Sequence, residues 1–363
     1  MIVLLNRVFR PPTLMIHPMK ARFIFIVTGM LFFPAVLFSQ SAVTLQRGEQ
    51  AQFFSSFTEA LAAAQQGDVM YLPGGTFNIG NVIINKKISI VGAGHYPSHT
   101  AATGITYLSG SVYLVSGADS TMLQGFYLTG DIRLGSTGEN QEVHFINISR
   151  CSFNDLYLSY NGYSETSATM ISISENVIRG GISGGYAQHV LINKNLVGIT
   201  IAHFNQNANF SNNIFLYNGP SYAPLITNVM ATTFYNNIFL AANYLVGTNS
   251  YGLGFYNNLF VNSFAIPGGS FGAENITGIS QADIFINQTG NSFSYDHDYH
   301  LKPTSAGVEG GSDGFDIGLY GSSVPYKEGA VPFNPHITDQ AISPGTNPQG
   351  QIEVNIQVEA QPR

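Results

Sequence analysis

A repeated six-residue motif constrains what this chain can fold into more than any other feature. FYNNIF occupies Phe234 to Phe239, and FYNNLF occupies Phe255 to Phe260, twenty-one residues later. Aligned on the second asparagine, the repeat extends to seven positions spaced by about 22 residues: Gly125, Cys151, Asn176, Asn195, Asn213, Asn237 and Asn258. Apolar residues lie three before each position, Met122 to Phe255, and two after, Tyr127 to Phe260. This alternation with polar neighbours predicts a β-strand in every repeat.

A unit of this size, with short strands and no helix, cannot bury its apolar face alone, so its copies must stack on one another. We therefore predict an all-β chain wound as one parallel β-helix of roughly ten coils, with equivalent residues about 4.8 Å apart. Asparagine suits the corner because it tolerates left-handed backbone conformations. Stacked side-chain amides would form a hydrogen-bonded ladder of Asn176, Asn195, Asn213, Asn237 and Asn258. Phe215, Phe239 and Phe260 would stack inside.

The N-terminus resembles a secretory signal. Lys20 and Arg22 precede an apolar run, residues 23–38, and Ser39-Gln40-Ser41 offers a small-x-small cleavage pattern. We predict an upstream extension and a signal peptide (about 19–41) within residues 1–41, a β-helix over 42–321, and a Pro- and Gly-rich tail over 322–363 with one strand, Ile352 to Val358. The alternative is an uncleaved anchor, but sixteen apolar residues are short for a span of about twenty. We expect a monomer, secreted or held at the cell surface or in the periplasm, with no stable membrane span.

A short helix is predicted at the start of the mature chain. Ser56 and Glu59 form a capping box, and Phe57, Leu61 and Ala64 share one face before Gly67 ends the helix. Such a helix would close the open end of the coil, which would otherwise expose core and strand edges.

Two segments carry a resemblance to a known family. FTEALAAAQQGDVMYLPGGTFNIG followed by VIINKKISIVGAG resembles the entry segment of the pectin-lyase-like right-handed parallel β-helix family. DYHLKPTSAGVEGGSDGFDIGLYG, from Asp298 to Gly321, resembles a closing motif of its exported bacterial members, although Thr304-Ser305 replaces the usual Ser-Pro. The resemblance covers about Phe53 to Leu319. It implies a right-handed coil and polysaccharide ligands, and many members are lyases or hydrolases.

No catalytic pattern lies in register with the repeat. A lyase of this type needs carboxylates that hold calcium beside a basic residue, and a hydrolase needs two or three aspartates on adjacent coils. The column before the ladder carries Arg150, Glu175 and Lys194, which we interpret as a solvated row of ion pairs; the alternative is a lyase base, Arg150 or Lys194, with Glu175 as its partner. The enzyme hypothesis requires at least three of these residues to meet in one groove: Asp131, Arg133, Glu142, Arg150, Asp155, Glu165, Glu175, Arg179 and Lys194.

Four aspartates are candidate calcium ligands: Asp296, Asp298, Asp313 and Asp316 lie among glycines, and oxygen ligands on such loops suit Ca²⁺. The alternative is that they cap turns. We expect no other cofactor.

An uncharged strip of outward side chains is a candidate glycan surface. It includes Asn193, Ser211 and two stacked tyrosines, Tyr235 and Tyr256. Sugars are bound by aromatic faces together with neutral hydrogen-bonding groups, although any solvated sheet face has a similar composition.

Composition limits the remaining function classes. The net charge of −7 and the absence of clustered Lys and Arg argue against nucleic acid. Cys151 is the only cysteine, so no intrachain disulfide can form, and we interpret it as a buried apolar residue. We expect an exported, carbohydrate-associated β-helix without a catalytic constellation. The alternatives are a polysaccharide lyase or glycoside hydrolase, and a structural or adhesive solenoid.

Overall fold

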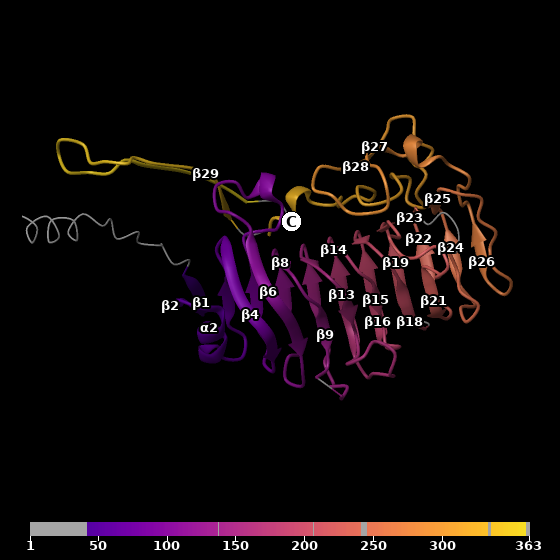
Figure 1. The fold of residues 1–363 in the computed structure, drawn as a ribbon, viewed down its shortest axis with the longest axis horizontal. Helices are drawn as coiled ribbons and strands as arrows, with labels where there is room; N and C mark the ends of the chain where they lie inside the picture. Colours follow the sequence, from indigo (N-terminus) through magenta and orange to yellow (C-terminus); the bar gives the residue numbers. More distant parts are fainter. Residues whose placement is uncertain (1–41, 137, 206, 241–244, 333–334, 361–363) are drawn as a thin grey trace, which may run out of the picture. The chain divides into compact units, whose positions relative to one another are not determined.

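The computed structural model describes residues 42–360 except 137, 206, 241–244 and 333–334, so the predicted signal segment lies outside the described residues. These residues form a parallel β-solenoid in which a 12-stranded and a 14-stranded sheet surround one apolar core (Figure 1). Ten strands of the first sheet, β3 to β26, pair in parallel, in agreement with the predicted number of coils. No helix among the described residues is long and apolar enough to cross a membrane.

The first sheet contains, in spatial order, β2 (Gln50–Phe54), β1 (Val43–Arg47), β3 (Val69–Tyr71), β5 (Ser89–Val91), β7 (Met122–Gln124), β10 (Asn147–Ser149), β13 (Thr169–Ser174), β16 (Gln188–Asn193), β19 (Ala208–Ser211), β22 (Thr233–Tyr235), β24 (Gly254–Tyr256) and β26 (Phe271–Ala273).

The second sheet begins with the long strands β4 (Gly75–Ile84) and β6 (Thr106–Leu114) and then divides into two rows. The corner row directly follows the asparagine corner and contains β8 (Tyr127–Leu128), β11 (Ser152–Phe153), β14 (Val177–Ile178), β17 (Leu196–Val197), β20 (Ile214–Phe215), β23 (Ile238–Phe239) and β25 (Leu259–Phe260). The far row contains β9 (Ile132–Leu134), β12 (Leu156–Tyr157), β15 (Ile182–Ser183), β18 (Ile201–Phe204) and β21 (Ile226–Val229).

The asparagine ladder is confirmed. Each side-chain Nδ2 donates to the Oδ1 of the next asparagine, at 3.0 Å for Asn176 to Asn195, 3.1 Å for Asn195 to Asn213, 2.9 Å for Asn213 to Asn237 and 3.0 Å for Asn237 to Asn258. The ladder continues to Asn275 at 3.1 Å, a member that the repeat did not reveal. The aromatic stack is also present, because the ring centroids of Phe239 lie 4.7 Å from Phe215 and 4.8 Å from Phe260.

The left-handed backbone lies one residue before the position that we predicted. Arg150, Glu175 and Lys194 have φ between 54° and 57°, whereas the ladder asparagines that follow them do not have a positive φ. Side chains rarely adopt this conformation unless the surrounding structure holds it. The column before the ladder is therefore the strained point of each corner.

The first aligned coil is out of register by one residue. Asn147 pairs with Met122 and Ser152 pairs with Tyr127, so Met122 and Tyr127 face outward and Phe126, not Gly125, occupies the ladder position. Gly125 takes the left-handed position, with φ of 74°, and a Cβ there would lie 2.4 Å from the Pro332 ring. Glycine is required because the chain passes so close at this corner.

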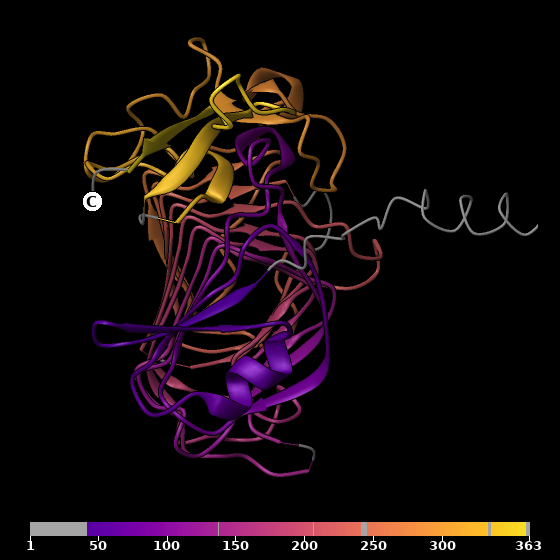
Figure 2. The same ribbon diagram turned by 90° about the vertical axis from the view of Figure 1, so that its left-hand side faces the viewer.

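The predicted capping helix is α2 (Phe57–Ala63), and it lies across the end of the coil (Figure 2). The Ser56 hydroxyl accepts a hydrogen bond from the Glu59 amide at 3.2 Å, and Phe57, Ala60 and Leu61 are buried. Strands β1 and β2 form an antiparallel hairpin beside it, which lies outside the repeat and was not predicted.

After β26 the chain runs back along the outside of the coils (Figures 1 and 2). We call residues 277–332 the return segment. It contains η2 (Gln281–Asp283), β27 (Phe285–Asn287), β28 (Asp298–Leu301) and η3 (Glu328–Ala330), and η1 (Pro97–His99) lies earlier in the chain. In the return segment, Ile317, Leu319 and Tyr299 form a second apolar cluster with the outward residues Leu196 and Ile238 of the corner row.

The tail forms a hairpin of two strands, β29 (His336–Ile342) and β30 (Val354–Glu359), where one strand was predicted.

Candidate functional site

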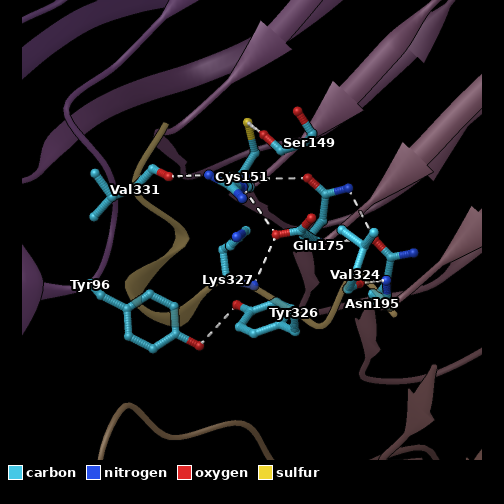
Figure 3. A network of polar contacts seen from close by, with 12 residues as sticks. Tyr96, Ser149, Cys151, Glu175, Asn195, Val324, Tyr326, Lys327 and Val331 are labelled. Atoms are coloured by element: carbon cyan, nitrogen blue, oxygen red, sulfur yellow. Dashed lines mark hydrogen bonds and ion pairs between the residues drawn. The ribbon is translucent and has the colours of Figure 1, made fainter. Parts of the chain in front are cut away.

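The return segment covers the column from which the weak catalytic candidates come. Arg150 is fully buried, its Nε donates to the Glu175 carboxylate at 3.0 Å, and its Nη1 donates to the Val331 carbonyl. Glu175 also accepts from the Lys327 amide at 3.1 Å (Figure 3). The ion pair between neighbouring coils therefore exists, but it is enclosed and not solvated, because a segment about 150 residues later packs on it.

Lys194, one coil further on, also binds the return segment through a hydrogen bond. It is 6% exposed, and its Nζ donates to the carbonyl of Val324. Burial lowers the pKa of both Lys194 and Arg150, and the charge of Glu175 opposes this shift. Neither side chain can reach a polysaccharide while the return segment lies over it, so the column attaches this segment to the coils.

The neutral strip presents fewer groups than its sequence suggested. Ser211 is 1% exposed, and its hydroxyl accepts from Asn193 Nδ2 at 2.7 Å. Tyr235 and Tyr256 are neighbours in register, with Tyr256 39% exposed, but the ring contacts of the described residues include no stacking between them. The strip therefore presents separate polar groups and not a stacked pair of aromatic rings.

Three of the four aspartates near the C-terminal end accept hydrogen bonds from nearby backbone amides. The Oδ1 atoms of Asp298, Asp313 and Asp316 accept from the amides of His300, Phe315 and Glu309 at 3.0, 3.2 and 3.0 Å. The fourth, Asp296, lies in a turn where its own amide donates to Ser294. Among the described residues, no three His, Cys, Asp or Glu side chains are close enough together to hold a metal ion.

Three of the nine charged residues named by the enzyme hypothesis lie together at the start of the far row, but only Asp155 lines the groove beside them, so the condition of three residues in one groove is not met. Asp131 precedes β9 and Asp155 precedes β12, and the Asn154 Nδ2 donates to both carboxylates, at 3.0 Å to Asp131 and 2.9 Å to Asp155. Arg133 pairs with Asp131 at 2.9 Å, and its guanidinium carbon lies 3.9 Å from the ring centroid of Tyr157. Tyr157 donates its hydroxyl to Asp155 at 3.3 Å.

Strand register explains why these side chains converge. Arg133 and Tyr157 are cross-strand partners and point outward, because their neighbours Ile132, Leu134 and Leu156 are buried in the core. In the next coil Gly180 leaves room for Asp155, since a Cβ there would lie 2.0 Å from Oδ1. The Gly181 amide donates to that same oxygen at 2.7 Å, so the backbone fixes the carboxylate.

A groove of about 160 Å³ lies beside Tyr157. We call it the carboxylate groove, and it is lined by Asp155, Tyr157, Gly181, Ile182, Ser183, Ile199, Thr200 and Ala202. Ser183 lies 3.3 Å from His203 Nδ1, and burial lowers the pKa of His203, so this imidazole is neutral at pH 7. Burial, followed by the charges of Asp155 and Asp131, raises the pKa of Tyr157, so its phenol keeps the proton that it donates.

The repeat spacing does not predict that Asp131 and Asp155 lie close together. Asp131 lies six residues after Gly125, but Asp155 lies only four after Cys151. One residue of this difference is the shifted register of the first coil, and the other is a shorter turn before β12. Tyr157 and Asn154 were missed for the same reason, although the turn Asn154-Asp155 followed by an aromatic residue was visible in the sequence.

A scan against models of protein families finds no match, and a search of curated proteins finds none either. The chemistry of the carboxylate groove is therefore judged from its own side chains. It offers the fixed carboxylate of Asp155, the protonated phenol of Tyr157 and the hydroxyls of Ser183 and Thr200.

Proposed function

We propose that the protein is an exported, carbohydrate-associated β-solenoid that binds a polysaccharide at the carboxylate groove. The observation that carries this proposal is the convergence of Asp131, Arg133 and Asp155 around Tyr157 on consecutive coils. The family resemblance of the entry and closing segments also supports a carbohydrate ligand. Export would bring the groove into contact with extracellular glycans.

The arrangement has the features that sugar recognition requires. A sugar ring presents hydroxyls and an apolar face, and sites for it combine an aromatic ring with a few fixed polar groups. Here the Gly181 amide and the Tyr157 hydroxyl hold Asp155 in place before any ligand arrives. Fixed groups lose little conformational freedom on binding, which favours affinity.

Hydrolysis of a glycosidic bond is the second candidate function, and the aspartate spacing favours it. Because one Asn154 nitrogen bonds to both carboxylates, the two bonded oxygens are at most about 6 Å apart, which permits the carboxyl separation of about 5 to 5.5 Å found in retaining glycosidases. A hydrolase also needs one carboxyl group that gives a proton to the leaving oxygen. Both carboxylates accept hydrogen bonds from Arg133, Asn154, Gly181 or Tyr157, so binding is the better supported function.

The test is a glycan array and affinity gels with purified wild-type protein, Asp155→Asn and Tyr157→Ala, with the Tyr235→Ala/Tyr256→Ala double variant as a matched control. We expect the first two variants to lose retention by at least about tenfold and the control to retain it. The opposite pattern would place binding on the neutral strip, and equal retention of all four proteins would reject both surfaces.

Two further assays address catalysis and export. Reducing-end release that disappears in Asp155→Asn would establish hydrolysis, and ultraviolet absorbance from unsaturated products would indicate a lyase. N-terminal sequencing of exported protein should begin near Ala42, and a sequence that begins at Met1 or Met19 would contradict cleavage.

A further inference from the structure

A half-buried arginine without a carboxylate partner lies on the other side of the turn that borders the carboxylate groove. Arg179 Nη1 donates to the Ser152 hydroxyl at 2.8 Å, and Nη2 donates to the carbonyls of Leu128 and Thr129 at 2.8 and 3.2 Å. Its guanidinium carbon lies 4.3 Å from the ring centroid of Tyr127. No ion pair of Arg179 occurs within the described part of the chain, where the nearby Asp131 pairs with Arg133 instead.

These contacts orient the guanidinium but do not neutralise it. Charged side chains removed from water are normally paired with an opposite charge. Burial lowers the pKa of Arg179, and the nearby tyrosines and Asp131 oppose that shift. These three hydrogen bonds use at most three of the five N–H donors of the group, so donors remain for an anion.

Arg179 lines a cavity of about 170 Å³ between the corner row and the return segment. Most of its wall is apolar, with Val177, Leu196, Leu216 and Phe293. Asn218 and Ser292 are exposed and stand at its opening. The cavity therefore combines one cation with an apolar chamber, which suits a small organic anion better than a neutral sugar or a strongly hydrated inorganic ion.

We propose that this cavity binds a small carboxylate with an apolar body, whose carboxylate pairs with Arg179 and whose body packs against Leu196, Leu216 and Phe293. The carboxylate accepts from the guanidinium N–H donors that Ser152, Leu128 and Thr129 leave unused, and the apolar wall supplies burial energy. This site is independent of the polysaccharide groove, since a different turn face and the return segment form it.

The experiment is isothermal titration calorimetry with benzoate, its neutral isostere benzamide, and sulfate. The proteins are wild type, Arg179→Gln and Asn218→Asp, with Asn81→Asp as the control, because it makes the same charge change at an exposed strand position elsewhere. Asn218→Asp places a repelling carboxylate at the opening without altering the core, so it tests the site even if Arg179→Gln does not fold.

We expect wild type and Asn81→Asp to bind benzoate with a Kd below about 1 mM, and Arg179→Gln and Asn218→Asp to bind at least about tenfold more weakly. Benzamide and sulfate should also bind at least about tenfold more weakly to wild type. Absence of benzoate binding to wild type, unchanged binding to Asn218→Asp, or equal affinity for benzamide or sulfate would each overturn the proposal.

Discussion

Replacement of Asn213 by alanine tests the ladder where it is most enclosed. The Asn213 Oδ1 accepts from the Asn195 amide at 2.8 Å and from Asn195 Nδ2 at 3.1 Å. Its Nδ2 donates to the Ile192 carbonyl at 2.9 Å and to Asn237 Oδ1 at 2.9 Å. All of these atoms are buried, so water cannot replace the side chain.

The expected loss follows from this count. Each of the four hydrogen bonds contributes about 1 kcal/mol net, and the Asn195 amide left without a partner adds about 1 to 3 kcal/mol, so the free energy of unfolding should fall by roughly 5 to 7 kcal/mol. That is a large share of the total stability of about 5 to 15 kcal/mol typical of folded proteins. Asn275→Ala at the last rung, where the side chain is only half-buried, should lose about half as much.

The assay is urea-induced unfolding monitored by far-ultraviolet circular dichroism, with Asn81→Ala as an exposed control that should change stability by less than about 0.5 kcal/mol. A loss below about 1.5 kcal/mol for Asn213→Ala, or a loss equal to that of Asn275→Ala, would refute the reasoning.

Three other predictions follow from buried or capped groups. Burial lowers the pKa of His95 to about 3, below the value of about 6.5 in an unfolded chain. The neutral imidazole therefore contributes to the free energy of unfolding fully above pH 6.5, and this contribution is lost as the pH falls towards 3. Between pH 7 and 5, wild type should lose about 2 kcal/mol more unfolding free energy than His95→Gln in urea titrations, and equal losses would contradict this. Burial raises the pKa of Cys151 to about 12, so a thiol reagent should label it only after denaturation; rapid labelling of native protein would show that it is accessible. Because backbone amides bond three of the four aspartates near the C-terminal end, a chelator should leave the melting temperature unchanged, and a fall would establish a bound cation.

The coil was predictable because its information is local and repeats. Alternation of apolar and polar residues around Asn176 to Asn258 defines the strand of each repeat. Equivalent residues of neighbouring repeats then pair with one another, which determines the register. The capping helix was predictable from Ser56 and Glu59 for the same reason.

The return segment was not predictable in this way. It has no repeat, and its partners are distant in sequence, since Val324 contacts a residue 130 positions earlier and Val331 one 181 positions earlier. The row of Arg150, Glu175 and Lys194 therefore looked solvent-exposed when only neighbouring coils were considered. The carboxylate groove was hidden by two smaller effects, the shifted register of the first coil and the shorter turn before β12.

The most direct measurement compares Glu175→Gln with Asp155→Asn in one experiment that records melting temperature and retention on the glycan gel. Glu175→Gln leaves Arg150 buried without its carboxylate, so it should melt at least about 5 °C lower while folded protein still binds. Asp155→Asn should melt close to wild type and lose binding. If Glu175→Gln loses binding at unchanged stability while Asp155→Asn binds normally, the functional site lies under the return segment and the assignment of the carboxylate groove is contradicted.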